Sequence, residues 1–370
     1  GNGSYSTADS YVKQVWDGRY TGIRMCNQLL ENIDRVPDLD PELKKRYIGE
    51  AKVLRAYNYY ELYTKFGDVP YTTKVLSIKE SMSIARTDRA TVIANMLADL
   101  DEVINGNYLP ASYDADNKGR ITRWAAMAIK AKIYLFEGNW TQVKNITSTI
   151  MTEGGFRLFG SYAGLFEIAN EYNSEVILDA QYRPTSREHQ MMYAFLPPSL
   201  GGYSQLSPLQ ELVDSYIMLD GKTIRETGTS FDESNPYANR DPRLKATVMY
   251  TGNSYTLADG TEVVINCEKG EGKDGYGVGS DCSATGYYIK KYWDNTYRAT
   301  LYSGLNPILI RYADILLMNA EALAELGELD KTAWDATIKP IRDRAGFTLA
   351  SAVEFPEGAS KDKLIEIVRN

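Results

Sequence analysis

Tyrosine is the residue type through which this chain could contact a ligand. The 370-residue sequence contains 28 Tyr but only 9 Phe. A tyrosine combines a flat apolar face with a hydrogen-bonding hydroxyl, which suits a surface that is partly exposed to water. Tyr57, Tyr60 and Tyr134 recur at helical spacing, so we expect these three to pack between helices. Candidates for binding are therefore the aromatic residues outside the helical segments.

Aromatic residues beside Pro and Gly in non-periodic segments have no helical core to fill. With two polar neighbours they form our candidate ligand-binding set, which is Tyr71, Tyr193, Tyr203, Tyr276, Trp293, Asn295, Tyr297 and Arg298. We expect these loops to gather into a shallow aromatic platform, with Asn295 and Arg298 as hydrogen-bonding partners. The alternative is that the rings only pack the irregular segments in which they lie.

Residues for acid–base or nucleophilic catalysis are scarce. His189 is the only histidine, so a histidine-based triad would depend on it alone. Its context, TSREHQMMY, indicates a surface loop. A pair of carboxylates acting as a glycosidase cannot be recognised or excluded without a fold, because such pairs have no sequence signature. We assign no catalytic residue and expect a protein that is not an enzyme.

Two apparent cofactor or metal motifs are interpreted as turns. The glycines of residues 270–275 spell GxGxxG, but no helix follows them, so no dinucleotide site is expected. Residues 114–119 resemble the start of a calcium loop, yet Ala125 occupies the position where a bidentate glutamate belongs. We therefore predict no metal site and no cofactor.

The chain has an odd number of cysteines, so at least one is unpaired or bonds elsewhere. Cys26 lies in a helical pattern and is expected to be a buried free thiol. Cys267 and Cys282 flank a glycine-rich loop, and in an exported protein we expect them to be close enough to form a disulfide.

Composition indicates an ordinary globular chain with a mildly acidic balance. Hydrophobic residues make up 44% and charged residues 24%, and the net charge is −8. This balance argues against nucleic acid or anionic membrane surfaces as partners, which need clustered Lys and Arg. No apolar run approaches the ~20 residues of a membrane span. Gly1 opens directly into polar sequence, so we expect any export signal to be absent from this chain.

A helical hairpin is the element that should position these residues, and it is clearest in Arg311–Phe347. An apolar stripe through Leu316 and Ala320 predicts a helix that ends at Gly327, and a second helix is expected from Asp330.

Thr122–Ile150 repeats this pattern, with Ala131 seven residues before Gly138 and Thr141 as the expected N-cap of the returning helix. Glu50–Gly67 is a weaker copy. This spacing is that of tetratricopeptide repeats.

The remaining chain divides into helical and irregular parts. Helices are expected over Ser10–Ile33, from Pro41 to Gly67 and from about Ala90. A short strand is predicted in EVILDAQY, and further strands in VVINC and GYYIKKYW. The least regular region is Arg183–Thr300, and we expect regular helices to resume at Ile308.

Several segments, in order, resemble the SusD/RagB family of outer-membrane nutrient-binding lipoproteins of Bacteroidetes-type bacteria. The segments are EAKVLRAYNYYELYTKFGDVPY, KGRITRWAAMAIKAKIYLFEGNW, ELVDSYIMLDGKTI, NRDPRLKATVMY, TGYYIKKY and RYADILLMNAEALAELG. Family members normally begin with a lipidated cysteine and close with an Arg-rich helix and a Trp-bearing segment. Because neither end is present, we expect this chain to be incomplete.

The resemblance implies a mainly α fold, a SusD-like α/α superhelix of tetratricopeptide-like hairpins. Residues 1–370 would be one SusD-like domain, with 10–155 and 308–370 as the helical scaffold. Residues 156–307 would form an irregular, loop-rich subdomain with a few short strands. The family's ligand-contacting residues vary between members, so none is carried over by motif.

The resemblance also implies a function. The expected protein is lipid-anchored on the extracellular face of the outer membrane when full-length, and it binds oligosaccharide or polysaccharide without hydrolysis. Its partner would be a SusC-like TonB-dependent transporter that receives the glycan. Sugar rings present a C–H face that packs on an aromatic plane, while their hydroxyls need polar partners, and the loops rich in Tyr, Asn and Arg supply both.

Two other functions stay open at this point. A tetratricopeptide-like scaffold would bind a peptide or protein helix in its concave helical groove, so removing Arg183–Thr300 should spare that binding. A helical glycosidase would release reducing ends from a glycan. Neither the identity of the glycan nor a peptide ligand in its place can be decided from these residues.

Overall fold

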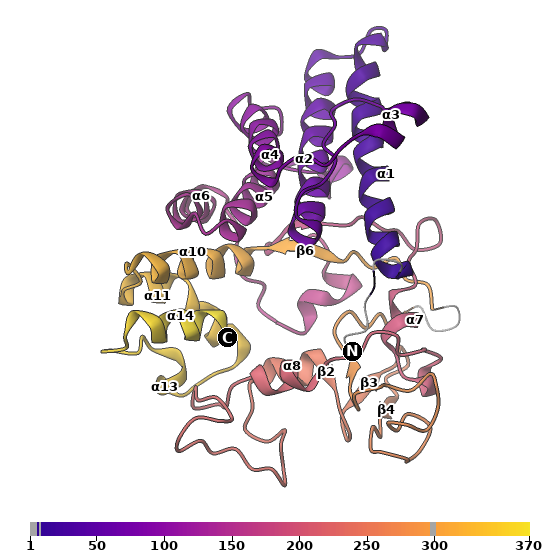
Figure 1. Cartoon of the computed structure of the whole chain (residues 1–370). Helices are drawn as coiled ribbons and strands as arrows, with labels where there is room; N and C mark the ends of the chain where they lie inside the picture. Colours follow the sequence, from indigo (N-terminus) through magenta and orange to yellow (C-terminus); the bar gives the residue numbers. More distant parts are fainter. Residues whose placement is uncertain (1–5, 7–8, 297–300) are drawn as a thin grey trace. The chain divides into compact units, whose positions relative to one another are not determined.

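The computed structural model describes residue 6, residues 9–296 and residues 301–370. It divides the chain into two compact units, Gly1–Gly154 and Gly155–Asn370 (Figure 1). Among the described residues, none of the helices combines the length and the hydropathy of a transmembrane segment.

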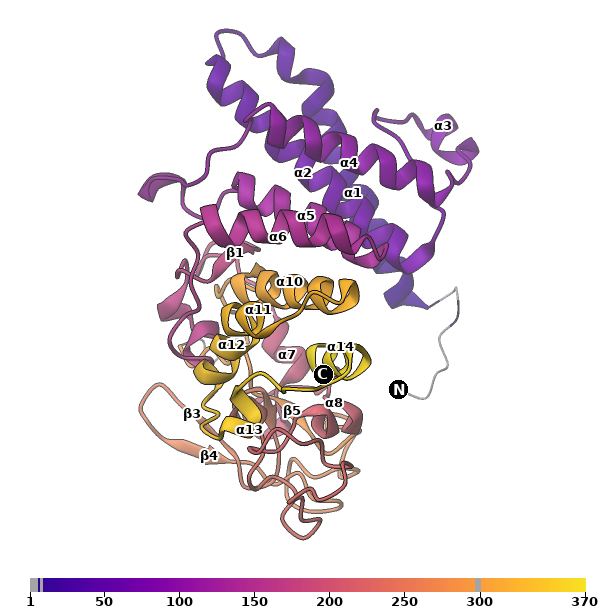
Figure 2. The same ribbon diagram turned by 90° about the vertical axis from the view of Figure 1, so that its left-hand side faces the viewer.

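The first unit is built from helices that pack against their neighbours. Its α-helices are α1 Ser10–Asn32, α2 Pro41–Phe66, α3 Ile78–Ser83, α4 Arg89–Asn105, α5 Arg123–Phe136 and α6 Trp140–Glu153, with 3₁₀ turns at η1 Ile33–Arg35 and η2 Ala115–Asn117. Helix α1 packs on α2, α2 on α4, α4 on α5, and α5 on α6 (Figure 2). The predicted helices are confirmed, whereas α3 was not anticipated.

Local sequence explains where α2 begins and ends. The Asp40 carboxylate accepts the backbone N–H of Leu43 at 2.9 Å, and Pro41 occupies the first turn, where its missing N–H is not needed. The helix ends at Gly67, whose φ of 68° is in the region that favours glycine.

The hairpin of α5 and α6 follows the predicted template with one correction. Ala131 is fully buried, so a larger side chain would not fit at this position. Gly138 turns the chain with φ 69°, and the side chain of the next residue, Asn139, accepts the N–H of Gln142 at 3.3 Å. Asn139, and not Thr141, is therefore the N-cap, because α6 begins at Trp140.

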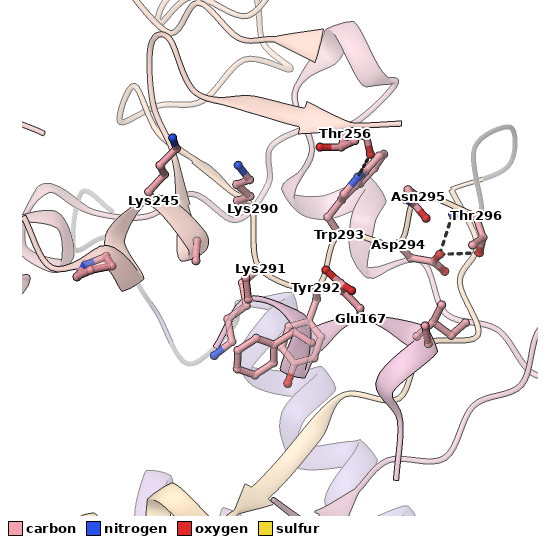
Figure 3. Close-up of a pocket in the computed structure, with 16 residues that line it drawn as sticks. Glu167, Lys245, Thr256, Lys290, Lys291, Tyr292, Trp293, Asp294, Asn295 and Thr296 are labelled. Atoms are coloured by element: carbon pink, nitrogen blue, oxygen red, sulfur yellow. Dashed lines mark hydrogen bonds between the residues drawn. The ribbon is translucent and has the colours of Figure 1, made fainter. Parts of the chain in front are cut away.

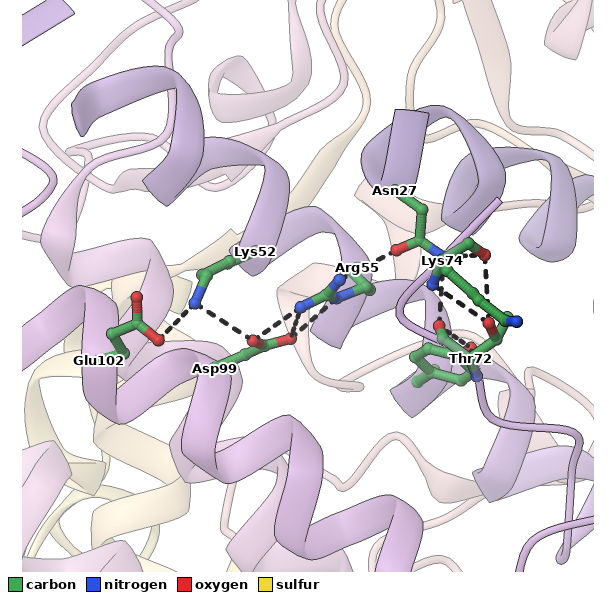
Figure 4. Close-up of polar contacts among 8 residues, drawn as sticks. Asn27, Lys52, Arg55, Thr72, Lys74, Asp99 and Glu102 are labelled. Carbon is green, nitrogen blue, oxygen red and sulfur yellow. Dashed lines mark hydrogen bonds and ion pairs between the residues drawn. The ribbon is translucent and has the colours of Figure 1, made fainter. Parts of the chain in front are cut away.

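A buried polar network joins three helices of the first unit (Figure 4). Arg55 on α2 donates from Nε and Nη2 to the two carboxylate oxygens of Asp99 on α4, at 2.9 and 2.8 Å. Its Nη1 donates to Asn27 on α1 at 2.9 Å, and Asn27 in turn donates to carbonyl groups of Thr72 and Lys74. This network fixes the extended segment that follows α2 against the helices.

The second unit combines short strands, 3₁₀ turns and helices. Its strands are β1 Val176–Asp179, β2 Val248–Met249, β3 Ser254–Thr256, β4 Glu262–Val264, β5 Tyr288–Ile289 and β6 Ile308–Arg311. Its α-helices are α7 Met191–Phe195, α8 Gln210–Ser215, α9 Pro242–Thr247, α10 Tyr312–Leu326, α11 Lys331–Ala336, α12 Ile338–Ala345, α13 Ala350–Val353 and α14 Lys361–Arg369, with 3₁₀ turns η3 Gly164–Phe166, η4 Ile168–Asn170 and η5 Pro198–Leu200. The strands pair antiparallel as β1–β6, β2–β5 and β3–β4.

The end of the chain corrects two predictions. Regular helix does not resume at Ile308, because 308–311 forms β6, which pairs with β1, and α10 begins at Tyr312. The single return helix predicted from Asp330 is divided into α11 and α12. Pro340 explains the division, because it has no N–H to donate to the carbonyl of Ala336.

The helices at the end of the chain share one apolar core. Ala320 and Ala324 of α10 lie with Trp334, Leu364 and Val368 in a buried cluster, and α14 packs on α10. The Trp334 indole N–H donates to the carbonyl of a residue in α13 at 2.9 Å, so its one polar atom is satisfied. The expectation that 10–155 and 308–370 form one scaffold stays a prediction, since the two segments belong to different units.

The predicted disulfide is absent. Cys26, Cys267 and Cys282 are free thiols. Cys267 is buried in the cluster that contains Tyr255 and Tyr288, and burial raises its pKa to about 12. The Cys282 thiol instead donates to a loop carbonyl at 3.4 Å. The two sulfur atoms therefore have separate surroundings, an apolar core and a loop backbone.

Candidate ligand-binding site

The second unit contains a pocket of about 690 Å³ (Figure 3). Its wall comes from 163–169, from 242–246 in α9, from Thr256 at the end of β3, and from 290–296. Two of these segments, 242–246 and 290–296, are brought together by strand pairing, because β2 follows α9 directly and pairs with β5, which precedes Lys290.

The segment 290–296 lines the pocket with seven consecutive residues. A regular strand could not do this, because its side chains alternate between two faces. Tyr292 has a φ of 63°, a left-handed conformation that is uncommon for a non-glycine residue, and this interrupts the alternation. Its hydroxyl accepts the N–H of Ile308 at 3.0 Å, which holds the unusual backbone in place.

Aromatic rings form one wall of the pocket. The indole N–H of Trp293 donates to the carbonyl of Thr256 at 2.8 Å, and its ring lies 5.2 Å from that of Tyr255. Phe166 and Tyr292 meet edge to face at 5.1 Å. The orientation of Trp293 is therefore fixed by contacts on its inner side, while the indole still lines the pocket.

Polar groups surround this wall. Lys290 donates from Nζ to the side chain of Asn253 at 2.9 Å. The Lys291 ammonium lies 3.8 Å from the centre of the Phe166 ring, a cation–π contact. Burial, and then the charge of Arg311, lowers the pKa of Lys291 to about 8.

Asp294 lines the pocket but serves the loop. Asp294 is 2% exposed, and its carboxylate accepts from the backbone N–H and hydroxyl of Thr296 at 3.0 and 2.6 Å and from the hydroxyl of Ser303 at 2.5 Å. A carboxylate with these bonds holds the loop that presents Trp293 and Asn295. It has little capacity left for a ligand.

The structure brings together some of the predicted site residues. Trp293 and Asn295 both line the pocket. Tyr193 and Tyr203 stack on each other, with ring centres 4.2 Å apart and planes 26° apart, and Tyr203 is 40% exposed. Within the second unit the four residues thus form two pairs, Trp293 with Asn295 in the pocket and Tyr193 with Tyr203 as a stacked pair of rings.

The other predicted residues are placed differently. Tyr276 is exposed in the glycine-rich loop, where its backbone N–H donates to the carbonyl of Cys267. Tyr71 belongs to the first unit and packs on Tyr59 at 4.5 Å. Burial raises the pKa of Tyr71 to about 12. Tyr297 and Arg298 lie outside the described residues.

Sequence reasoning missed several pocket residues. Tyr292, Lys290 and Lys291 lie in GYYIKKYW, which was interpreted only as a strand. The dense run of aromatic and basic residues was the available signal. Phe166 ends the 3₁₀ turn η3 and Glu167 follows it, far from 290–296 in the sequence, and no local pattern points to them.

His189 has a structural role and is not a surface loop residue. It is half-buried, its Nε2 lies 2.8 Å from the carbonyl oxygen of Leu305, and its Nδ1 accepts the N–H of Met191 at 3.3 Å. The backbone of His189 also exchanges hydrogen bonds with Ser303. Both ring nitrogens are thus engaged in holding two segments together. Within the part of the chain that the structure describes, no group of three His, Cys, Asp or Glu side chains could hold a metal ion.

Two family models match this chain. Residues 165–370 match the model described as the SusD family, and residues 2–135 match one described as starch-binding associating with outer membrane. A curated relative, SusD-like protein P25 of Formosa agariphila, is 32% identical over 338 residues. That alignment covers 85% of this chain and 59% of the relative, so the chain spans well under two thirds of that protein.

Solved structures share the fold. A SusD-like carbohydrate binding protein from Bacteroides fragilis superposes with a TM-score of 0.85 at 27% identity, covering 98% of this chain and 70% of that chain. A laminarin binding SusD-like protein gives a TM-score of 0.66 at 24% identity, covering 96% and 74%. The mainly helical, SusD-like fold expected from the sequence is confirmed.

Proposed function

Because the chain belongs to the SusD family, we propose that this protein captures oligosaccharide or polysaccharide at the cell surface without cleaving it. The protein is associated with the outer membrane, in agreement with the description of the second family model. We propose further that the full-length protein is lipid-anchored on the extracellular face. A related protein of the same fold is described as carbohydrate binding.

The pocket lined by 290–296 is the observation that carries this proposal. Its volume of about 690 Å³ is within the range of ligand sites. An indole wall can pack against the C–H face of a sugar ring, while Asn295, Lys290 and Glu167 offer groups for its hydroxyls. A sugar needs this combination of a flat apolar surface and several polar groups.

The pocket gives little support to hydrolysis. A glycosidase needs two carboxyl groups that flank the scissile bond, one of them available as an acid. Glu167 and Asp294 are the carboxylates among the described lining residues, and Asp294 is already bonded to Thr296 and Ser303. The arrangement therefore favours retention of a glycan over cleavage.

We propose a SusC-like TonB-dependent transporter as the partner that receives the glycan. Membership of the SusD family supports this proposal. Co-purification of the full-length protein with its neighbouring transporter from outer membranes would test it. Recovery of the protein without any transporter, under conditions that keep the membrane complexes intact, would argue against it.

Affinity electrophoresis through gels that contain different polysaccharides tests the binding function. We expect retarded migration in at least one glycan gel relative to a gel without glycan. The panel should include neutral, carboxylated and sulfated polysaccharides, and albumin provides a non-binding reference. Unchanged migration throughout the panel would contradict glycan binding.

A further inference from the structure

Three lysines line the same pocket, which is unusual for a chain with a net charge of −8. Lys245 is exposed on α9, and Lys290 and Lys291 follow β5. Both of the latter donate their backbone N–H to the carbonyl of Thr247, at 2.9 and 3.3 Å, which holds them beside α9. Figure 3 shows Lys245 and Lys290 next to each other, on one side of Trp293.

Carboxylates do not neutralise this group. Among the described residues no salt bridge joins a carboxylate to Lys245, Lys290 or Lys291. The Lys290 ammonium donates to the neutral amide of Asn253, and Glu262 acts on it only through its charge, without forming an ion pair. Other lysines of the chain, such as Lys331, do have acidic partners.

The acidic groups near the lysines are already engaged. Glu175, the buried carboxylate near Lys291, binds Arg311 and Arg344, each at 2.8 Å. Asp314 accepts the backbone N–H of Arg311. Asp294 is satisfied by its own loop, and Glu262, whose charge acts on Lys290, accepts from the hydroxyls of Ser254 and Thr256. Glu167 is the remaining carboxylate of the described pocket wall, and it is exposed. The lysines thus outnumber the free acidic groups.

The uncompensated charge is costly to maintain without a ligand. Burial lowers the pKa of Lys290, and the charge of Lys245 lowers it further, while the charge of Glu262 offsets part of this effect. Burial also lowers the pKa of Lys291. A bound anion would relieve both effects, because an opposite charge within a few ångströms favours the charged form of an amine. A neutral sugar would not.

We propose that this pocket accepts an acidic glycan, whose sugar units carry a carboxylate or a sulfate group. The inference rests on the proposed glycan-binding function. Lys245 and Lys290 contact the anionic group, and Trp293 packs on the sugar ring that carries it. Lys291, whose ammonium lies over Phe166, strengthens the local positive potential without direct contact.

The test compares three polysaccharides by isothermal titration calorimetry: a polyuronate, a sulfated galactan and neutral laminarin. We expect binding of at least one acidic polymer, with an affinity that falls as NaCl is raised from 50 to 500 mM, because salt screens charge–charge contacts. The two acidic polymers distinguish a carboxylate from a sulfate. Lys245→Gln and Lys290→Gln should each weaken that binding about tenfold.

Lys361→Gln is the matched control, since Lys361 is an exposed lysine of the same unit outside the pocket. It should bind like the unmodified protein, and thermal unfolding checks that all variants fold. Binding of laminarin alone, or acidic binding that the pocket variants do not weaken, would overturn the acidic specificity and leave glycan binding intact. Binding of no polymer would overturn both.

Discussion

Trp293 and Tyr203 are the aromatic residues of the second unit with the clearest opportunity to contact a sugar. Trp293 lines the pocket, and its indole N–H donates to the carbonyl of Thr256. Tyr203 presents an exposed ring supported by Tyr193. The two rings differ in their structural role, because Trp293 also packs against the core around Tyr255.

Replacement of these rings should weaken glycan binding. Trp293→Ala and Tyr203→Ala are each expected to cost roughly 1 to 3 kcal/mol of binding free energy, by analogy with the stacking of bases on aromatic side chains. Isothermal titration calorimetry measures this loss of binding free energy, with the glycan that retards the protein in affinity electrophoresis as the ligand. Tyr11→Ala, which removes an exposed ring of the first unit, is the control.

Stability measurements separate binding from packing in these variants. Tyr203→Ala should unfold at nearly the temperature of the unmodified protein. Trp293→Ala should be somewhat less stable, because the indole also packs on Tyr255. If both variants lose stability and retain full binding per folded molecule, these aromatics are structural and the platform hypothesis is wrong.

Lys291 makes stability depend on pH in a direction that can be worked out. The pKa of Lys291 is about 8 in the folded protein, against an ordinary value of 10.5 for a solvated lysine, as in the unfolded chain. As pH rises, the folded state therefore releases this proton first. Between these values the unfolded state binds more protons, and stability therefore increases with pH. The loss of stability caused by burying the charged Lys291 ammonium is fully present below pH 8. By pH 10 about 2 kcal/mol of this loss should be relieved.

Urea unfolding at pH 7 and pH 10 of the unmodified protein and of Lys291→Met measures this effect. The difference in unfolding free energy between the two proteins should change with pH by about 2 kcal/mol. Comparison with the variant removes the contribution of tyrosines, which titrate near and above pH 10. A difference that is the same at both pH values would show that Lys291 keeps an ordinary pKa.

At the scale of elements, buried charges connect the helices of the first unit. Arg55 is 5% exposed, and the carboxylate of Asp99 is its ionic partner across α2 and α4 (Figure 4). Asn27 adds a neutral contact from α1. A buried ion pair adds little folding stability compared with apolar residues of similar size. The loss of one partner, however, leaves the other charge buried and unpaired, which is strongly destabilising.

Asp99→Ala should therefore destabilise the protein by about 3 to 5 kcal/mol, because Arg55 would remain buried without its carboxylate. Urea unfolding followed by circular dichroism provides the measurement. Asp17→Ala is the matched control, since Asp17 pairs with Lys13 at an exposed position of α1 and should have almost no effect. Equal effects of the two substitutions would mean that the network does not connect the helices.

At the scale of the whole molecule, we expect a protein that retains a glycan and does not alter it. Incubation with any polysaccharide that it binds should release no new reducing ends, because its pocket lacks a free pair of carboxyl groups. A reducing-sugar assay over a day, with a glycosidase of the same substrate as positive control, provides the measurement. Release of reducing ends that Glu167→Gln abolishes would identify an enzyme.

The helices could be predicted from the sequence because their signals are local. The small residue, aromatic and glycine spacing around Ala131 and Gly138 predicted the α5–α6 hairpin, and Pro41 and Gly67 marked the ends of α2. The ordered family segments likewise indicated the fold. A helix bonds each residue to one four positions away, so its periodicity appears directly in the sequence.

The site was decided by the tertiary structure. Lys245 and Lys290 are distant in sequence, and they meet because β2 pairs with β5. Phe166 and Glu167 join them from another segment that carries no pattern. Tyr71 had the same local signals as Trp293, yet it packs on Tyr59 in the other unit. Strand pairing between distant segments depends on the burial of their side chains in the folded chain, which a local pattern does not reveal.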